Sequence, residues 1–334
     1  AACRFEEVAY LILNKDLPNS IQLKKFEKEE RENRELTKNL YEIINHMPKK
    51  SHPMDVARTA VSVMGLEDKE TSNSSHEANM RKALRIFAKT PTAIAAFYRI
   101  RKGKKIIKPK KTLSFSENFF YMCFGKVPEK EIVKAFDVSL ILYAEHSFNV
   151  STFTARTITS SLSDIHGAIT GAIASLKGPL HGGANEEVMH MMKKIKKPEN
   201  ALKWINEALD KKHVVMGFGH RVYKSGDSRV PTMREYFKKV AKIKKDKIFE
   251  KIYDIVEKVM IKRKNIYPNV DYPTGPTYHL MGFDTDFFTP IFVISRITGW
   301  SAHIMEQHAA NKLIRPLAKY KGSTHRKVLQ LNQR

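Results

Sequence analysis

Apolar side chains recur along much of this chain at the three- and four-residue intervals that place them on one face of an α-helix. Six of them follow a 4-3-4-3-4 spacing: Ile158, Leu162, Ile165, Ile169, Ala172 and Leu176. This spacing predicts a single helix whose small intervening residues would let neighbouring helices pack closely. A second helix is predicted by a similar stripe: Val133, Phe136, Leu140 and Tyr143.

Helix start signals support this interpretation. A serine or threonine shortly before a proline is typical of a helix start, because the hydroxyl can cap the helix and proline fits its first turn. Such groups occur at Thr289-Pro290, at Thr90-Pro91 and in Ser51-His52-Pro53. Strand signals are sparse, and residues 214–216 are a short candidate. The sequence therefore predicts a mainly α fold with very little strand.

Composition restricts the class of protein. The chain has 334 residues, of which 42% are hydrophobic, so it can bury a large core or two domains. No stretch approaches the roughly 18 uninterrupted apolar residues of a membrane helix. Two cysteines, Cys3 and Cys123, cannot form a disulfide framework or a four-cysteine zinc site, which favours a reducing compartment.

The formal net charge of +24 needs an explanation. Its lysines are spread along the chain and are mostly spaced like solvated helix faces or loops, and nothing resembles a zinc finger or an aromatic RNA-binding signature. A solvated surface is therefore the first interpretation. Attraction of polyanionic small substrates is the second, and nucleic-acid binding is the third.

Three breaks in the regular pattern carry groups suited to acid–base chemistry. His181 lies in the glycine turn of residues 178–186, and His220 lies in that of residues 217–223. Asp271 follows Pro268 in a third segment. Glycine permits sharp turns and close approach of a ligand, and loops held on a rigid scaffold often carry catalytic groups. Taken singly, each could be an ordinary turn, but together they predict an active site.

Arginines indicate the substrate class. Arg296 shares a helix face with Phe292 in an otherwise apolar segment, where a guanidinium is costly unless an anion meets it. The alternative is a structural ion pair, for example with Glu306. Arg229 and Arg315 are further candidates, and several arginines together would suit a di- or tricarboxylate, because arginine binds carboxylates through a planar fork. Asp284 and Asp286 are a weak metal signal, since the other EF-hand ligands are absent.

Several segments taken together resemble the citrate synthase family. They lie in order along the chain: residues 143–149, 178–186, 217–223, 227–229, 268–271 and 288–316. Nearly the whole chain, from about residue 4, is similar to the shorter bacterial-type members, and most similar to the branch that contains 2-methylcitrate synthases. The family's usual N-terminal section is expected to be absent from this chain.

The resemblance implies a role for each matching residue. His181 would hydrogen-bond the thioester carbonyl, His220 would polarise and protonate the oxaloacetate ketone, and Asp271 would remove the α-proton. The oxaloacetate-binding positions would be His146, Arg229, Arg296 and, delivered across a dimer interface, Arg315. The coenzyme A positions would be Val214, Val215, Met216, Gly217, Phe218, Gly219, Lys224 and, as a looser match, Lys264.

The resemblance also implies a two-domain helical architecture, and higher charge between about residues 185 and 285 fits an inserted domain. We expect a large domain of residues 1–181 and 289–334, with the dimer interface and part of the site. Residues 182–288 would form a small domain on the acyl-CoA side of the cleft.

The implied function is an acyltransferase that condenses acetyl-CoA or propionyl-CoA with oxaloacetate and water, through an enol intermediate, to give citrate or 2-methylcitrate. No cofactor or metal is expected, because the coenzyme A thioester is a substrate. A homodimer is expected, with neither nucleic acid nor membrane as a partner, in the cytoplasm or, in a eukaryote, the mitochondrial matrix. The alternative is a non-catalytic protein that keeps this fold as a scaffold or binds polyanions.

Overall fold

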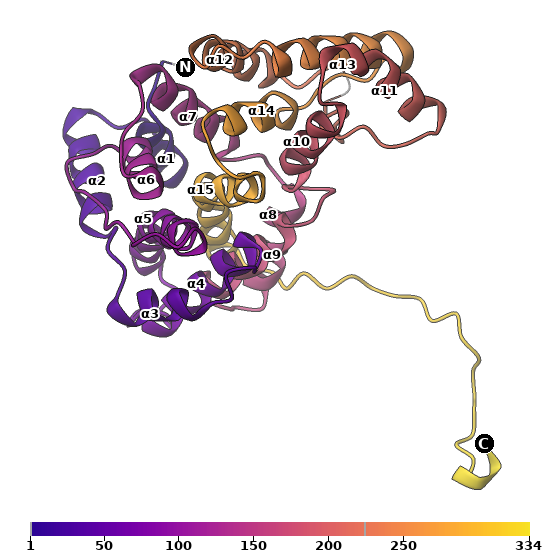
Figure 1. Cartoon of the computed structure of the whole chain (residues 1–334). Helices are drawn as coiled ribbons and strands as arrows, with labels where there is room; N and C mark the ends of the chain where they lie inside the picture. Colours follow the sequence, from indigo (N-terminus) through magenta and orange to yellow (C-terminus); the bar gives the residue numbers. More distant parts are fainter. Residues whose placement is uncertain (1, 224) are drawn as a thin grey trace.

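Helices make up nearly all of the regular structure, as the hydrophobic spacing predicts (Figure 1). The structure is a computed structural model that describes residues 2–223 and 225–334. The first nine helices are α1 (Phe5–Asn14), α2 (Ser20–Glu32), α3 (Lys38–His46), α4 (Pro53–Glu67), α5 (His76–Arg101), α6 (Phe115–Phe124), α7 (Lys130–Tyr143), α8 (Val150–Ser160) and α9 (Ile165–Leu176). They are followed by α10 (Ala184–Ile195), α11 (Pro198–Asp210), α12 (Val230–Ile243), α13 (Ile248–Lys264), α14 (Asp271–Leu280) and α15 (Phe288–Ala309), with short 3₁₀ turns η1 (Thr285–Phe287) and η2 (Leu331–Gln333).

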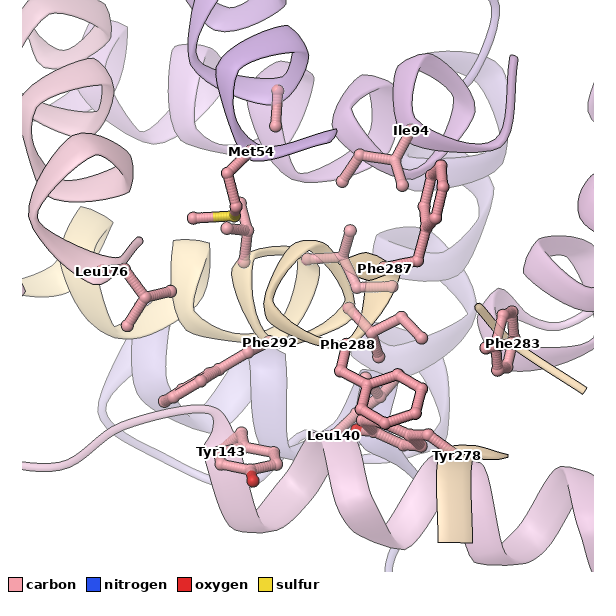
Figure 2. Close-up of a cluster of buried hydrophobic side chains, with 14 of the residues drawn as sticks. Met54, Ile94, Leu140, Tyr143, Leu176, Tyr278, Phe283, Phe287, Phe288 and Phe292 are labelled. Carbon is pink, nitrogen blue, oxygen red and sulfur yellow. The ribbon is translucent and has the colours of Figure 1, made fainter. Parts of the chain in front are cut away.

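Helix α15 forms the centre of the hydrophobic core. Most of its residues are buried on every side, and a helix that is apolar all round must be enclosed by other elements. It contacts α1, α4, α5, α7, α8, α9 and α10. Figure 2 shows its aromatic residues Phe288 and Phe292 among Met54 of α4, Leu176 of α9 and Tyr143 of α7. A polar side chain on this helix is therefore held in a fixed place by its neighbours.

Helices α10 to α14 form a second group, at the top of Figure 1. Within it α11 packs on α13, and α14 packs on both α10 and α12. The group meets the first one where α12 contacts α7 and where α10 contacts α15. Among the residues that the structure describes, no helix is long and apolar enough to cross a membrane.

The prediction of one helix between Ile158 and Leu176 is wrong. A turn at residues 161–164 separates α8 from α9, and Leu162 in that turn has a φ of 66° and an exposed side chain. The polar run around the break explains it, because the Asp164 carboxylate accepts from the backbone N–H of Gly167, at 3.0 Å, and starts a new helix. The apolar spacing continues across the turn because the two helices pack on each other.

The helix start signals had different outcomes. Helix α4 starts at Pro53, as predicted, but its cap is His52, whose Nδ1 accepts from Met54 N–H at 3.2 Å, rather than the Ser51 hydroxyl. Pro91 instead lies inside α5, so no helix starts there. Helix α15 starts at Phe288 rather than after Thr289. Its start is extended by η1, and Thr289 donates its backbone N–H to the Glu186 carboxylate at 3.2 Å, so the cap comes from a different helix.

The short strand expected at residues 214–216 is not formed. An isolated bridge pairs Phe218 with Pro268 instead. Two further backbone hydrogen bonds join the same loops, from Gly219 N–H to the Tyr267 carbonyl (2.8 Å) and from Asn269 N–H to the Gly217 carbonyl (2.9 Å). The loops that carry His220 and Asp271 are therefore fastened side by side.

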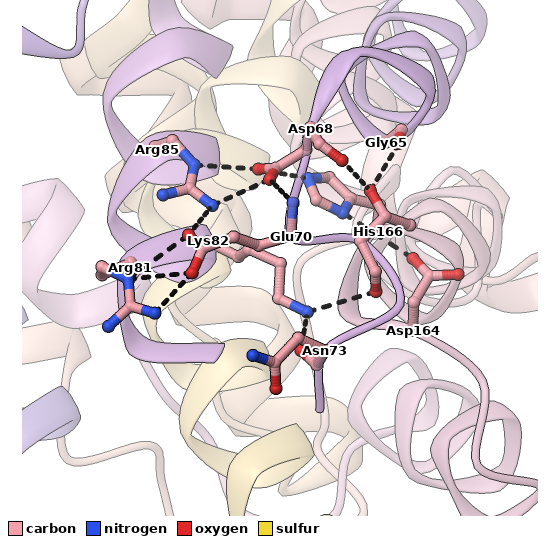
Figure 3. A network of polar contacts seen from close by, with 10 residues as sticks. Gly65, Asp68, Glu70, Asn73, Arg81, Lys82, Arg85, Asp164 and His166 are labelled. Atoms are coloured by element: carbon pink, nitrogen blue, oxygen red, sulfur yellow. Dashed lines mark hydrogen bonds and ion pairs between the residues drawn. The ribbon is translucent and has the colours of Figure 1, made fainter. Parts of the chain in front are cut away.

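Buried charges fasten the loop between α4 and α5 to the start of α9 (Figure 3). The fully buried Lys82 donates to the carbonyls of Thr71 and Asn73 at 3.3 and 2.5 Å. His166 of α9 lies 3.7 Å from carboxylate oxygens of both Asp68 and Asp164. These contacts fix one end of α9, and its other end leads directly into the turn that carries His181.

Candidate active site

A cavity of about 500 Å³ lies where the two groups of helices meet. Its walls come from the loop after α7, the turn after α9, the loop before α12, the start of α14 and the middle of α15. Seven of the predicted site residues line it: His146, His181, Gly219, His220, Arg229, Asp271 and Arg296. The cavity thus brings together residues that are up to 150 positions apart in the sequence.

Asp271 is the first residue of α14, where the helix N-terminus favours a negative charge. The Asn269 side chain holds the segment in place, because its Oδ1 accepts from Asp271 N–H (3.1 Å) and its Nδ2 donates to the Gly219 carbonyl (3.0 Å). Burial raises the pKa of the Asp271 carboxyl group to about 6, against the opposing effects of the Tyr143 hydroxyl and Arg229. A carboxylate with a pKa near neutrality is suited to general-base work.

His181 depends on the glycines of its turn. A Cβ on Gly182 would lie 2.7 Å from the Leu176 carbonyl, so the turn admits no larger residue there. The His181 Nε2 lies 3.3 Å from the backbone nitrogen and 2.8 Å from the hydroxyl of Ser151. Because a backbone N–H can only donate, Nε2 accepts, and this network assigns the ring proton to Nδ1. Burial, then Arg296, lowers the pKa of His181 to about 4, so the ring is a neutral Nδ1–H donor.

The tautomer of His220 follows from the same reasoning. Its Nδ1 accepts from the backbone N–H groups of Val222 (3.0 Å) and Tyr223 (3.2 Å), so in the neutral ring the proton lies on Nε2. The ring of His146 lies 5.0 Å from it, centroid to centroid. Burial, then Arg229 and Arg296, lowers the pKa of His146 to about 4. The His146 ring can therefore donate one hydrogen bond without carrying a charge.

Arg296 is only 1% exposed. Its Nε donates to the Tyr143 carbonyl at 2.6 Å, and its guanidinium lies 4.7 Å from the centre of the Phe292 ring. Its Nη1 is buried and has no hydrogen-bond partner among residues 2–223 and 225–334. Burial, then Arg229, lowers its pKa to about 9. The Glu306 pairing considered as an alternative does not occur, because Glu306 pairs with Arg156 at 3.1 Å.

Arg229 is oriented by a carboxylate. The Asp227 side chain accepts from its Nε at 2.9 Å and from its Nη2 at 2.7 Å. Asp227 also accepts from Val270 N–H at 3.0 Å, which connects Arg229 to the segment that precedes Asp271. The cavity is therefore faced by three hydrogen-bond donors, the neutral ring of His146 and the cationic groups of Arg229 and Arg296. Such a space suits an anion.

The remaining predicted residues lie elsewhere. Arg315 is exposed on the extended C-terminal segment, away from this cavity. In the loop before α12, Gly219 lines the cavity, whereas Val214 is exposed and Val215 is buried. Met216, Gly217 and Phe218 continue this loop, and Gly217, with a φ of 83°, packs its backbone against Tyr272. Lys264 is exposed at the end of α13, and Lys224 lies outside the described residues.

Three residues of the site were not predicted. The Tyr143 hydroxyl donates to Asp271 Oδ1 at 2.5 Å, Ser151 contacts His181, and the Trp300 indole N–H donates to the Ser151 hydroxyl at 3.2 Å. Tyr143 stands in the segment that also carries His146, and this neighbourhood was the one sequence signal that could have pointed to Tyr143.

The two aspartates considered as a weak metal signal have another explanation. Asp284 pairs with Lys102 at 2.9 Å and Asp286 pairs with Arg101.

The chain is similar to known proteins over nearly its whole length. Residues 1–317 match the family described as citrate synthase, C-terminal domain. The chain is 50% identical over 329 residues to a citrate synthase of Mycolicibacterium smegmatis, which covers 98% of this chain and 88% of that protein. It is 49% identical over 326 residues to a 2-methylcitrate synthase of Mycobacterium tuberculosis, and this match covers 98% of this chain and 82% of that protein.

A solved structure with a similar fold contains ligands. It is the ternary complex of carboxymethyl coenzyme A and oxaloacetate with the citrate synthase of the archaeon Thermoplasma acidophilum. The two folds agree with a TM-score of 0.93 at 32% identity, over 99% of this chain and 89% of that one.

Proposed function

We propose, from the premise that this chain belongs to the citrate synthase family, that the cavity between α7, α14 and α15 is its active site. The chain is an acyltransferase that condenses an acyl-CoA, acetyl-CoA or propionyl-CoA, with oxaloacetate and water to give citrate or 2-methylcitrate and coenzyme A. What remains to be assigned is which side chain performs each step.

The state of Arg296 is the observation that carries the assignment. A guanidinium that is 1% exposed and has an unpartnered Nη1 is costly, and its lowered pKa expresses that cost. A substrate carboxylate would remove the cost by supplying the missing charge and the missing acceptor. Arg229 and His146 face the same space, so we assign the two carboxylates of oxaloacetate to these three residues.

His220 acts on the ketone of oxaloacetate in this proposal. Because its Nδ1 accepts from the backbone N–H groups of Val222 and Tyr223, the neutral ring carries its proton on Nε2, and we assign this N–H as the donor. A hydrogen bond to the ketone oxygen withdraws electron density from the carbonyl carbon and makes it more electrophilic. As the new carbon–carbon bond forms, the same ring transfers its proton to the alkoxide.

Asp271 and His181 would form the nucleophile. Asp271 accepts a proton from the α-carbon of the acyl-CoA, while the Nδ1–H of His181 donates to the thioester oxygen as negative charge develops there. The neutral state of His181 suits this task, because a neutral donor stabilises the enolate oxygen without a charge of its own. This hydrogen-bonded enolate has the character of the expected enol intermediate. Its α-carbon then attacks the ketone carbon of oxaloacetate, and hydrolysis of the acyl-CoA adduct releases coenzyme A.

We assign coenzyme A to the side of the second group of helices. We assign its adenine to the loop of residues 214–219 and its phosphates to Lys264 and to Lys224, of which the latter lies outside the described residues. We further propose that residues 182–288 move as a small domain against residues 1–181 and 289–334, because the cavity lies between these parts and closure would exclude water. The homodimer, with Arg315 serving the partner's site, remains a prediction.

A thiol-release assay tests the proposal directly. The unmodified chain should release free thiol from acetyl-CoA, propionyl-CoA or both, and only when oxaloacetate is present. Arg296→Leu should weaken oxaloacetate affinity by roughly 2–5 kcal/mol, whereas Arg263→Leu, which removes an exposed arginine paired with Asp210, should leave it unchanged. No thiol release from either substrate would contradict the proposal and favour the scaffold alternative.

A further inference from the structure

We propose that Tyr143 is a positioning residue that holds the Asp271 carboxylate in register with the oxaloacetate-binding arginine. This inference rests on the proposed role of Asp271 as the base. It begins with the 2.5 Å hydrogen bond in which the Tyr143 hydroxyl donates to Asp271 Oδ1. Because that bond occupies Oδ1, Oδ2 becomes the atom that accepts the proton of the acyl group.

Tyr143 is itself fixed from three directions. It is the last residue of α7 and is 1% exposed. Its backbone carbonyl accepts from Arg296 Nε at 2.6 Å, and its ring centroid lies 4.0 Å from that of Phe292 (Figure 2). Both of these partners belong to α15, the core helix. A side chain held in this way can orient another group far more precisely than a mobile one could.

The contact also joins the two groups of helices. Asp271 belongs to α14, in the second group, whereas Tyr143 and Arg296 belong to the first. One residue therefore touches the proposed base through its hydroxyl and the proposed anion-binding arginine through its carbonyl. The distance between proton acceptor and second substrate depends on this link, and small errors in such a distance are costly to the rate.

The hydroxyl acts on the charge of Asp271 as well. Burial and the neighbouring Asp271 raise the pKa of the Tyr143 phenol well above its ordinary value, so the phenol stays a donor. A donor hydrogen bond favours the ionised carboxylate and opposes the effect of burial on the Asp271 pKa. The other charged groups that act on Asp271 are Asp227 and Arg229, before α12, and Arg296 of α15.

The experiment compares the pH dependence of kcat/KM for the acyl-CoA in four proteins. Tyr143→Phe removes only the hydroxyl, and we expect kcat/KM to fall by about 10- to 100-fold with its acidic limb moved to higher pH. The oxaloacetate dissociation constant should not change, and the isotope effect with an α-deuterated acyl-CoA should increase. A 3-fluorotyrosine at position 143, which is a stronger donor, should move the limb to lower pH.

A second buried tyrosine provides the matched control. Tyr278 lies on α14, the helix that begins with Asp271. Its hydroxyl pairs with Ser139 at 2.9 Å rather than with Asp271. Tyr278→Phe should leave the limb and the isotope effect unchanged. The inference would be overturned if neither change at Tyr143 moved the acidic limb of the kcat/KM profile. It would also be overturned if the only effect were weaker binding of oxaloacetate.

The fourth protein, Asp271→Asn, separates this inference from the proposed function. If Asp271→Asn abolishes turnover while both changes at position 143 leave the limb unmoved, only the positioning role is wrong. If Asp271→Asn keeps near-normal turnover, the base assignment itself is wrong, and the inference falls with it. The opposite shifts expected for phenylalanine and fluorotyrosine are effects that a purely structural tyrosine would not produce.

Discussion

Individual side chains in the cavity are prepared for their tasks by burial and by each other. Burial, and then the arginines that would bind substrate carboxylates, lowers the pKa of each histidine to about 4: Arg229 and Arg296 act on His146, and Arg296 acts on His181. The histidines therefore donate hydrogen bonds as neutral rings, while Asp271, with a pKa of about 6, remains ionised at neutral pH. Charged arginines, neutral histidines and one carboxylate are the set that an enolisation beside a dianion needs.

Replacing Asp271 with asparagine removes the base and preserves the size of the side chain. Turnover should fall by at least about 10²–10⁴-fold, the usual contribution of a positioned acid or base. Oxaloacetate affinity should barely change, because the proposed partner of Asp271 is the acyl-CoA. Steady-state kinetics with both acyl-CoA substrates, together with an oxaloacetate titration, check this. Near-normal turnover with both substrates would show that another group removes the proton.

The pH dependence of the unmodified chain follows from the direction of one shift. Asp271 must be ionised to accept a proton, and burial raises its pKa to about 6. We therefore expect kcat/KM for the acyl-CoA to be lost as the pH falls through about 6. His146 and His181 should add no limb between about pH 5 and 8, because their pKa values lie near 4. An acidic limb at an ordinary carboxylate pKa would contradict the burial effect.

The sequence predicted most of these residues but few of their contacts. His181, His220 and Asp271 stand in turns that can be recognised locally, and Arg296 is conspicuous within an apolar helix. The bond between Tyr143 and Asp271 joins residues 128 positions apart, and that between Trp300 and Ser151 joins residues 149 apart. No spacing rule along the chain reports such a pair, because the contact exists only once α7, α14 and α15 have packed.

At the scale of elements, periodicity predicted which residues are buried better than where helices end. The stripe from Ile158 to Leu176 is buried except at Ile158, which is half-buried, and at Leu162, which is exposed, yet it belongs to two helices. Ser163 and Asp164, between the two helices, were the sequence signal for a break. The apolar spacing continues across them and therefore predicted one helix. Conversely, Thr90-Pro91 has the local chemistry of a start, but the surrounding core keeps α5 continuous, since both residues are buried within it.

A substitution at Gly299 tests how closely α15 must approach the loop that carries His146. A methyl group there would lie 2.6 Å from the Ala144 carbonyl oxygen and 3.1 Å from Glu145 Cα, both of them backbone atoms. We expect Gly299→Ala to cost about 1–3 kcal/mol and to weaken oxaloacetate binding by displacing His146. Thermal unfolding and an oxaloacetate titration measure the two effects.

Gly171→Ala is the control for this change. It also adds a methyl group to a helix, but the atoms that it would meet belong to the side chains of Ile158 and Thr154, which can move. Its effect on unfolding should be the smaller of the two, and oxaloacetate binding should not change. Equal losses in both variants would mean that the approach of α15 to residues 144–146 is not specially constrained.

At the scale of the molecule, the two groups of helices match a contrast in composition. Most lysines from residue 193 onward in α10 to α13 are exposed, so the charge of this region covers the second group, whereas the apolar stripes enclose α15. This contrast predicted an inserted unit, but it could not predict the cavity, because a cavity is made by the relative placement of both units.

The last prediction concerns the C-terminal segment and its place in the predicted homodimer. Asn311 and Ile314, which follow α15, still donate hydrogen bonds to Ser160 at the end of α8. The chain beyond them extends away from the helices (Figure 1), and Arg315 is exposed. If Arg315 completes the oxaloacetate site of a second copy, Arg315→Ala should lose oxaloacetate affinity although it lies outside its own cavity. Light scattering should also report a dimer for the unmodified chain.

Mixing two inactive variants distinguishes a shared site from a local one. In a heterodimer of Arg315→Ala and Asp271→Asn, a shared arrangement leaves one cavity with both Asp271 and the partner's arginine, and the other cavity with neither. Random mixing in equal amounts should then restore about a quarter of the unmodified activity, because about half of the dimers are mixed and each has one intact site. If Arg315 served its own chain, every cavity would lack one of the two groups and the mixture would stay as inactive as its components. Recovery of activity on mixing therefore assigns the C-terminal segment to the partner's site, and its failure withdraws Arg315 from that role.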